Sequence, residues 1–288
     1  MVNIKKYCFL LLLLLIFLPA VASGAHRSKT HFSPLKAALL VDADSGRVLY
    51  EHNSGRLTQP ASLSKILTLY LINEDISAGK IHLSDAVRIS AKAVNTNGQK
   101  MLYEEGREVL LDDLIKGIAI FSANDAAIAV AEYVEGSVGK FVERMNAKAR
   151  ELGMLHSNFV NPHGLPDKRQ LTTAHDICIL SREYLQRFPD TLHIHSIHYF
   201  RYNSVTQENS NTLLKDCPDV DGLKTGFVRA AGYHLVATAK RGDIRLIAVV
   251  LGAKNPKARA YQTKKLLESG FRIIGEKRPR APHSLIGA

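Results

Sequence analysis

The sequence lacks three features that would each point to a particular class of protein: many cysteines, an excess of glycine or proline, and a long apolar run beyond its first 20 residues. It has three cysteines in 288 residues, 19 glycines and 10 prolines, and beyond its first 20 residues no apolar run that could span a membrane. So few cysteines exclude a small disulfide-built scaffold, and a chain of this length can bury a sizeable core without them. Ordinary glycine and proline contents, with 46% apolar residues, exclude collagen-like, coiled-coil and linker sequences. A globular protein remains.

Acidic residues are also scarce relative to basic ones. Asp and Glu number 27 against 38 Lys and Arg, so the formal charge is +11 and the isoelectric point is near 9.5. This excess suggests an anionic partner. The basic residues are scattered along the chain and do not form a block, which argues against a nucleic-acid ligand.

The first residues carry the pattern of a secretory signal peptide. Lys5 and Lys6 precede an apolar run over residues 7–18, and small residues follow at positions 20–25. The run is shorter than the roughly 20 residues of a membrane-spanning helix. We therefore expect a signal peptide over residues 1–22 and an exported protein, periplasmic or extracellular and associated with the cell wall. Cleavage after Ala22 removes two lysines and no acid, leaving 266 residues with a formal charge of +9.

Cysteine and histidine give little reason to expect a bridge or a bound metal. After loss of Cys8 the chain keeps Cys178 and Cys217, which we expect to be unlinked, partly buried thiols. There are twelve histidines, but no H-E-x-x-H or Cys/His spacing typical of a zinc site. We predict no metal and no cofactor.

Apolar periodicity and turn residues predict an α+β fold. An antiparallel sheet is expected from the two ends of the chain, with flanking helices and a helical lobe between them. The expected strands cover residues 37–41, 47–50, 220–224, 233–239 and 245–251, and the expected helices residues 63–72, 110–120, 125–134, 137–152, 173–187 and 261–267. We expect one domain of two lobes over residues 30–275 and a short basic tail over 276–288, with no second domain and no membrane anchor.

Ser62 and Lys65 form an S-x-x-K motif at the start of a strongly apolar helix. Residues three apart on a helix lie on one face, so the lysine amine can reach the serine hydroxyl. Burial and a neighbouring cation would lower the pKa of the amine and allow it to act as a base. The motif is common by chance and is weak evidence alone.

Two further motifs follow in a fixed order. Ser122, Ala123 and Asn124 form S-x-N between two expected helices, and Lys224, Thr225 and Gly226 form K-T-G in a strand. A hydroxyl and an amide suit proton relay and peptide binding, whereas glycine in a strand lets another backbone approach closely. Each motif alone is better read as a helix cap or a strand end; the ordered set is much more specific.

The set and the residues around it resemble the low-molecular-mass penicillin-binding proteins of the D-alanyl-D-alanine carboxypeptidase family. The resemblance runs from about residue 37 to 271 and implies a β-lactamase/transpeptidase-like fold. It is carried by the three motifs and by residues 60–68, 161–165, 221–226 and 231–233.

The resemblance also implies roles for individual residues. Ser62 would attack the carbonyl of a D-Ala-D-Ala stem peptide or of a β-lactam, Lys65 would be its base, and Ser122 would pass the proton to the leaving amine. Asn124 would bind the substrate amide, Lys224 would be an electrostatic partner, and Gly226 would lie beside the substrate backbone. The N–H groups of Ser62 and Phe227 would form an oxyanion hole. Thr225 and Arg259 would bind the terminal carboxylate.

Other functions stay open at this stage. An endopeptidase of the same family is the nearest alternative to a serine-type carboxypeptidase inhibited by β-lactams. A β-lactamase is disfavoured because no E-x-x-L-N segment lies between Ser122 and Lys224 and the middle motif reads S-A-N. A non-catalytic wall binder would explain the charge alone. Phe227 departs from the polar residue that often follows K-T-G. We expect a monomer that acts on peptidoglycan stem peptides.

Overall fold

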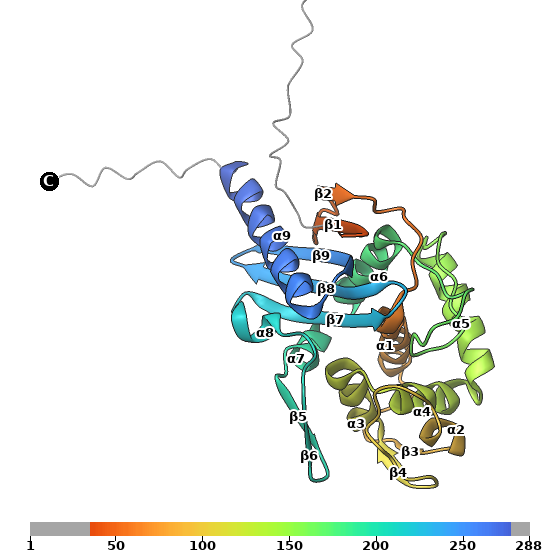
Figure 1. Ribbon diagram of the computed structural model, residues 1–288. Helices are drawn as coiled ribbons and strands as arrows, with labels where there is room; N and C mark the ends of the chain where they lie inside the picture. Colours follow the sequence, from red (N-terminus) through yellow and green to blue (C-terminus); the bar gives the residue numbers. More distant parts are fainter. Residues whose placement is uncertain (1–34, 278–288) are drawn as a thin grey trace, which may run out of the picture. The chain divides into compact units, whose positions relative to one another are not determined.

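The computed structural model describes residues 35–277 (Figure 1). These described residues form one compact unit. The predicted signal peptide and all but the first two residues of the predicted tail lie outside the described residues. Within residues 35–277, no helix is long and apolar enough to cross a membrane.

A five-stranded antiparallel sheet joins the two ends of the described chain. Its strand order is β2-β1-β9-β8-β7. The strands are β1 (Ala37–Asp42), β2 (Val48–His52), β7 (Val220–Val228), β8 (Gly232–Arg241) and β9 (Ile244–Ala253). The N-terminal hairpin pairs with the last strand, with Ala37 opposite Leu251. The predicted α+β fold, with one sheet assembled from both termini, is confirmed.

Alternate residues of the central strands enter two different cores, as the period of two in a strand requires. On β1, Leu39 packs into the larger core and Leu40 into the smaller one. The smaller core lies under α9 (Pro256–Lys277) and α8 (Leu213–Asp216), and the larger one contains α1 (Ser64–Ser77) and α6 (Ala174–Arg187). Figure 1 shows α9 across one face of the sheet and α6 and α1 beyond the other. Burial on both faces explains why β9 is apolar almost throughout.

The remaining elements extend the chain beyond the sheet, and several of them pack around α1 (Figure 1). Helix α1 is buried from Ser64 to Ile72 and contacts α4, α5 and α6, so its apolar residues cover the whole circumference. These elements are η1 (Ala61–Leu63), β3 (Ala86–Arg88), α2 (Ala91–Val94), β4 (Glu108–Leu110), α3 (Leu111–Lys116), the π-helix η2 (Gly117–Phe121), α4 (Asn124–Glu135), α5 (Val138–Glu151), η3 (Pro189–Thr191), α7 (Leu192–His195), β5 (Tyr199–Tyr202) and β6 (Val205–Glu208).

The last helix begins earlier than the sequence pattern indicates. Pro256 is its first residue, a position where proline is favoured, and the Asn255 side chain accepts a hydrogen bond from the Ala258 N–H at 2.7 Å. Arg259 therefore lies inside the first turn of α9, and the expectation that it precedes the helix is wrong.

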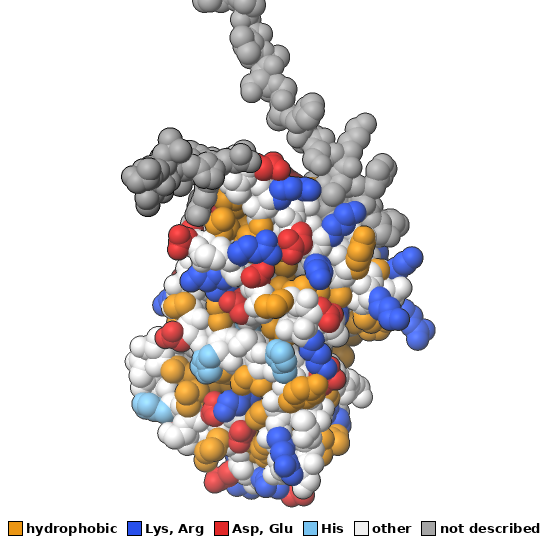
Figure 2. Space-filling view, turned by 90° about the vertical axis from the view of Figure 1, so that its left-hand side faces the viewer, with side chains coloured by type: hydrophobic (Ala, Val, Ile, Leu, Met, Phe, Trp, Pro, Cys, Tyr) orange, Lys and Arg blue, Asp and Glu red, His pale blue; other side chains and the backbone are white. Residues whose placement is uncertain are grey.

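In the described region, the distribution of charged side chains and the state of the two cysteines match what the sequence predicts. Lys and Arg side chains are interspersed with Asp and Glu over the face seen in Figure 2. Cys178 and Cys217 are both free, as predicted. Residues 35–277 contain no group of three or more His, Cys, Asp or Glu side chains that could hold a metal ion.

Candidate active site

Ser62 lies in η1, in a tight turn just before α1, and is half-buried. The preceding Ala61 has φ +51°, a left-handed conformation that a non-glycine residue rarely adopts. Two glycines from distant segments press on this turn. A Cβ on Gly226 would lie 3.2 Å from the Ser62 nitrogen, and one on Gly164, at φ +89°, would overlap the Ala61 carbonyl. Packing from both sides thus supports the unusual backbone of the turn.

Lys65 extends from the first turn of α1 to the Ser62 hydroxyl. Its Nζ lies 3.2 Å from Ser62 Oγ, 2.7 Å from Asn124 Oδ1 and 2.6 Å from the His163 carbonyl oxygen. The side chain has no exposed surface. The Lys65 amine thus meets the Ser62 hydroxyl, as the S-x-x-K spacing predicts, and it also meets Asn124 of the S-x-N motif at the start of α4.

The surroundings of Lys65 favour its neutral form. Burial, with a smaller effect from the Lys224 charge, holds the pKa of Lys65 well below its usual range. The oxygens of Asn124 and His163 can only accept hydrogen bonds, so they take the two protons of a neutral amine. Its lone pair is then left for the Ser62 hydroxyl, which is the arrangement that a general base needs.

Lys224 is the second buried cation of the site. It is 1% exposed, and its Nζ donates to the Thr225 carbonyl at 3.1 Å. Burial and then the Arg259 charge lower the pKa of Lys224 to about 7. The charge on Lys224 in turn contributes to the lowered pKa of Lys65.

The loop that supplies the His163 carbonyl is fixed by buried polar side chains. Thr68 of α1 donates to the Pro162 carbonyl at 2.7 Å. Gln170, 1% exposed, accepts the N–H groups of Val160 and Asn161 at 3.0 and 3.1 Å. Gln170 was not among the predicted site residues, because its role depends on a contact made only in the folded chain. The imidazole of His163 accepts the Leu165 N–H at 3.2 Å, a bond within the loop itself.

Asn124 and Asp125 join the start of α4 to the segment over residues 97–102. Asn124 Nδ2 donates to the Asn97 carbonyl at 2.6 Å, so Asn124 Oδ1 is oriented toward Lys65. The Asp125 carboxylate accepts the N–H groups of Met101 and Leu102 at 3.1 and 3.0 Å. Asp125 is thus occupied by backbone groups, and no carboxylate within residues 35–277 hydrogen-bonds to Ser62 or Lys65.

Ser122 sits where the chain turns from η2 into α4. It is 3% exposed and has φ +69°, in the left-handed region. Among the described residues its hydroxyl makes no hydrogen bond to Ser62, Lys65 or Lys224. Its assigned part in proton relay stays a prediction.

Thr225 and Arg259 both hydrogen-bond to Ser210, a residue that the sequence did not predict for the site. Thr225 Oγ1 lies 2.7 Å from the Ser210 hydroxyl, and Arg259 Nη2 donates to the Ser210 carbonyl at 3.1 Å. Arg259 is 6% exposed and its Nε has no partner among the described residues. A buried guanidinium with a free donor beside two hydroxyls is suited to bind a carboxylate. The only local signal for Ser210 is its position between Asn209 and Asn211.

Buried amides hold Ser210 in place. Asn209 Nδ2 donates to the carbonyls of His195 and Ile197, at 3.1 and 2.9 Å, and Asn211 Nδ2 donates to the Gly222 carbonyl at 3.0 Å. Both amides thus tie the segment to α7 and β7.

Phe227 differs from the other predicted residues because its side chain is 51% exposed. Its ring stacks on Tyr233 of β8, with centroids 4.2 Å apart. The prediction for Phe227 concerns its backbone N–H and stays a prediction; the preceding residue, Gly226, packs against the Ser62 turn.

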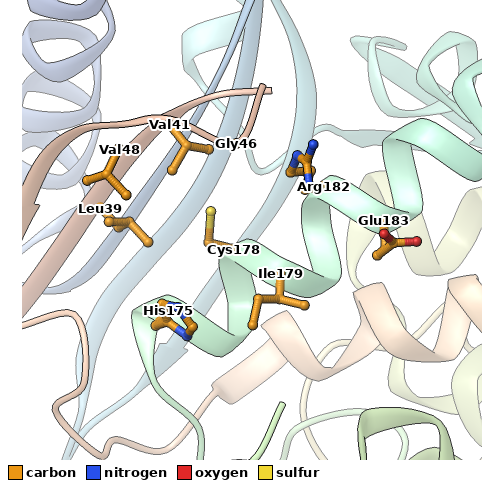
Figure 3. A pocket seen from close by; sticks show the side chains of 9 residues that line it. All are labelled: Leu39, Val41, Gly46, Val48, His175, Cys178, Ile179, Arg182 and Glu183. Carbon is orange, nitrogen blue, oxygen red and sulfur yellow. The ribbon is translucent and has the colours of Figure 1, made fainter. Parts of the chain in front are cut away.

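A pocket of about 170 Å³ lies elsewhere, between α6 and the β1–β2 hairpin (Figure 3). None of the predicted site residues lines it. It contains Cys178, whose pKa burial raises to about 12, and Arg182, which donates to the carbonyls of Ala43 and Asp44. Its largely apolar walls and unreactive thiol do not suggest catalysis.

Comparisons with known proteins identify the family of the chain. The family of D-alanyl-D-alanine carboxypeptidases matches residues 27–255. The chain is 40% identical over 270 residues to D-alanyl-D-alanine carboxypeptidase DacF of Bacillus subtilis, covering 90% of this chain and 68% of the relative.

Two solved structures are similar in fold. Penicillin-binding protein 5 from Haemophilus influenzae superimposes with a TM-score of 0.81 at 37% identity, covering 84% of this chain and 73% of that one. Penicillin-binding protein D2 from Listeria monocytogenes, in its ampicillin-bound form, gives 0.72 at 31% identity, covering 82% and 97%. The predicted penicillin-binding fold is confirmed, and the chain belongs to the D-alanyl-D-alanine carboxypeptidase family.

Proposed function

We propose that this protein is an exported serine-type carboxypeptidase that removes the terminal D-Ala from peptidoglycan stem peptides and is inhibited by β-lactams. The observation that carries the proposal is the buried Lys65 amine, 3.2 Å from the Ser62 hydroxyl, with its other two neighbours both acceptors. Export rests on the signal-peptide pattern of the first residues, and wall association on the basic charge.

In the acylation step, Ser62 Oγ attacks the carbonyl carbon of the penultimate D-Ala while Lys65 takes the hydroxyl proton. The N–H groups of Ser62 and Phe227 stabilise the oxyanion. The C–N bond then breaks, and the leaving D-Ala amine receives a proton through Ser122. An ester links the shortened peptide to Ser62.

Substrate orientation is assigned to the groups around the K-T-G strand. The free carboxylate of the terminal D-Ala binds Thr225 and Arg259, beside the Ser210 hydroxyl. Asn124 binds the peptide amide. Lys224 stabilises the anionic substrate and keeps Lys65 neutral. A water molecule then hydrolyses the ester and restores Ser62.

β-Lactams acylate the same serine, since they offer an amide carbonyl and a carboxylate in one small molecule. Turnover of this ester is expected to be slow. No carboxylate of the described residues hydrogen-bonds to Ser62 or Lys65, so none is held there as a general base for rapid hydrolysis of the ester. This favours inhibition over a β-lactamase function.

The activity is tested with soluble pentapeptide muropeptides and cross-linked dimers, analysed by liquid chromatography and mass spectrometry. We expect each pentapeptide to lose one alanine, with dimers left intact, and Ser62→Ala to release none. Splitting of dimers without release of D-Ala would replace the proposal with the endopeptidase alternative. Failure of the wild-type protein to act on either substrate would contradict both.

A further inference from the structure

His234 is a buried histidine of β8 that the mechanism above does not use. It has no exposed surface and pairs across the sheet with Gly226 of β7. Its Nδ1 accepts the Gly252 N–H at 2.9 Å. Because a backbone N–H can only donate, Nδ1 carries no proton, and the proton of the neutral ring is on Nε2.

This tautomer gives His234 a defined second bond. Nε2 lies 3.1 Å from the Gln59 carbonyl oxygen and donates its proton to it. Burial lowers the pKa of His234 to about 4, so the ring stays neutral near neutral pH. The imidazole therefore links the sheet at Gly252 to the chain at Gln59.

Gln59 begins the short segment that presents the nucleophile. Pro60 and Ala61 separate it from Ser62, and Ala61 holds a left-handed φ of +51°. At the other end of the segment, Gly226 packs against the Ser62 nitrogen. The turn is thus fixed to neighbouring strands at both ends, by close packing at Ser62 and by a hydrogen bond at Gln59.

We propose that His234 is a positioning residue for the nucleophile: its Nε2–H bond to Gln59 fixes the turn on the sheet, and so sets the distance between Ser62 Oγ and Lys65 Nζ. The side chain of His234 hydrogen-bonds to Gln59 and Gly252 and not to the reacting atoms or to the groups assigned to the substrate carboxylate, of which Arg259 acts on it only through its charge. Its effect should appear in the acylation step and not in binding before it. This inference rests on the proposed function of Ser62.

Two substitutions test the hydrogen bonds of the ring to Gly252 and to Gln59 one at a time. His234→Asn retains an acceptor near the position of Nδ1 for Gly252 but is too short to reach Gln59. His234→Gln is long enough to offer an N–H to Gln59. We expect the acylation rate constant with a fluorescent penicillin to fall about 10²-fold in His234→Asn, the size of effect caused by a misplaced reacting group. In His234→Gln most of the rate should return.

Affinity and stability are measured on the same proteins. The dissociation constant of the complex that precedes acylation should stay near the wild-type value in both variants. Thermal unfolding should show that both are folded, and Ser181→Ala, which removes a buried hydrogen bond to Ile177 within α6, serves as a control for stability loss remote from the turn.

The outcomes are distinct. Wild-type acylation rates in His234→Asn, or equal losses in His234→Asn and a folded His234→Gln, would overturn the positioning role. If His234→Asn does not fold, His234→Gln decides alone: a folded variant that has lost acylation contradicts the inference. A wild-type protein that is never acylated would instead refute the proposed function.

Discussion

Replacing Ser62 with alanine should abolish covalent labelling by a fluorescent penicillin and lower the rate of D-Ala release by about 10⁶-fold in kcat, the loss seen when a serine nucleophile is removed. The reason is that the acyl-enzyme ester cannot form without Ser62 Oγ. Labelling is measured on denaturing gels, and release of D-Ala by a coupled assay. Unfolding temperature should change little, because Ser62 is only half-buried.

Ser64→Ala is the matched control, since it removes another hydroxyl two residues away. Ser64 Oγ is buried, donates to the Ala61 carbonyl at 3.1 Å and accepts from Gln170 Nε2 at 3.4 Å, and it makes no hydrogen bond to Lys65. We expect this variant to keep its labelling. Labelling that survives in Ser62→Ala would mean that another residue is the nucleophile.

Replacing Lys65 with arginine should lower the acylation rate by about 10²–10⁴-fold, the usual contribution of a general base. Arginine stays positively charged and does not deprotonate in proteins, so it cannot accept the Ser62 proton. The second-order rate of acylation by a penicillin, followed by stopped-flow fluorescence, measures the effect. Near wild-type rates in Lys65→Arg would show that Lys65 acts only as a charge.

The pH profile of the same rate tests the cause of the lowered pKa. Wild-type acylation should rise as pH rises through the pKa of Lys65, which is where the base loses its proton. Lys224→Gln removes a neighbouring positive charge, so the pKa of Lys65 rises and this acid limb should move to higher pH. The same change at the exposed Lys240 should leave the limb in place. A limb that moves to lower pH in Lys224→Gln would contradict the assignment.

Sequence reasoning succeeded where the signal is local. The Asp44–Gly46 turn between apolar stretches predicts the β1–β2 hairpin, and Thr173 caps α6 by accepting the Asp176 N–H, as its residue type indicates. The spacing of Ser62 and Lys65 likewise predicts that their side chains meet. In each case a few consecutive residues determine the geometry.

Sequence reasoning failed where function depends on contacts between distant segments. Gln170 reaches the His163 loop, Ser210 joins Thr225 to Arg259, and His234 reaches Gln59 across 175 positions. A lone polar residue in an apolar stretch such as β8 could have been noted, but its partner could not be read from the sequence. Tertiary contacts alone give these side chains their roles.

The account as a whole rests on a covalent bond to one atom, and that bond can be located directly. Purified protein is incubated with a penicillin, digested with trypsin and analysed by tandem mass spectrometry. One adduct per chain is expected, in the peptide over residues 57–65 and on Ser62 when the fragments distinguish it from Ser64. An adduct on any other residue, or none on the folded wild-type protein, would contradict the account.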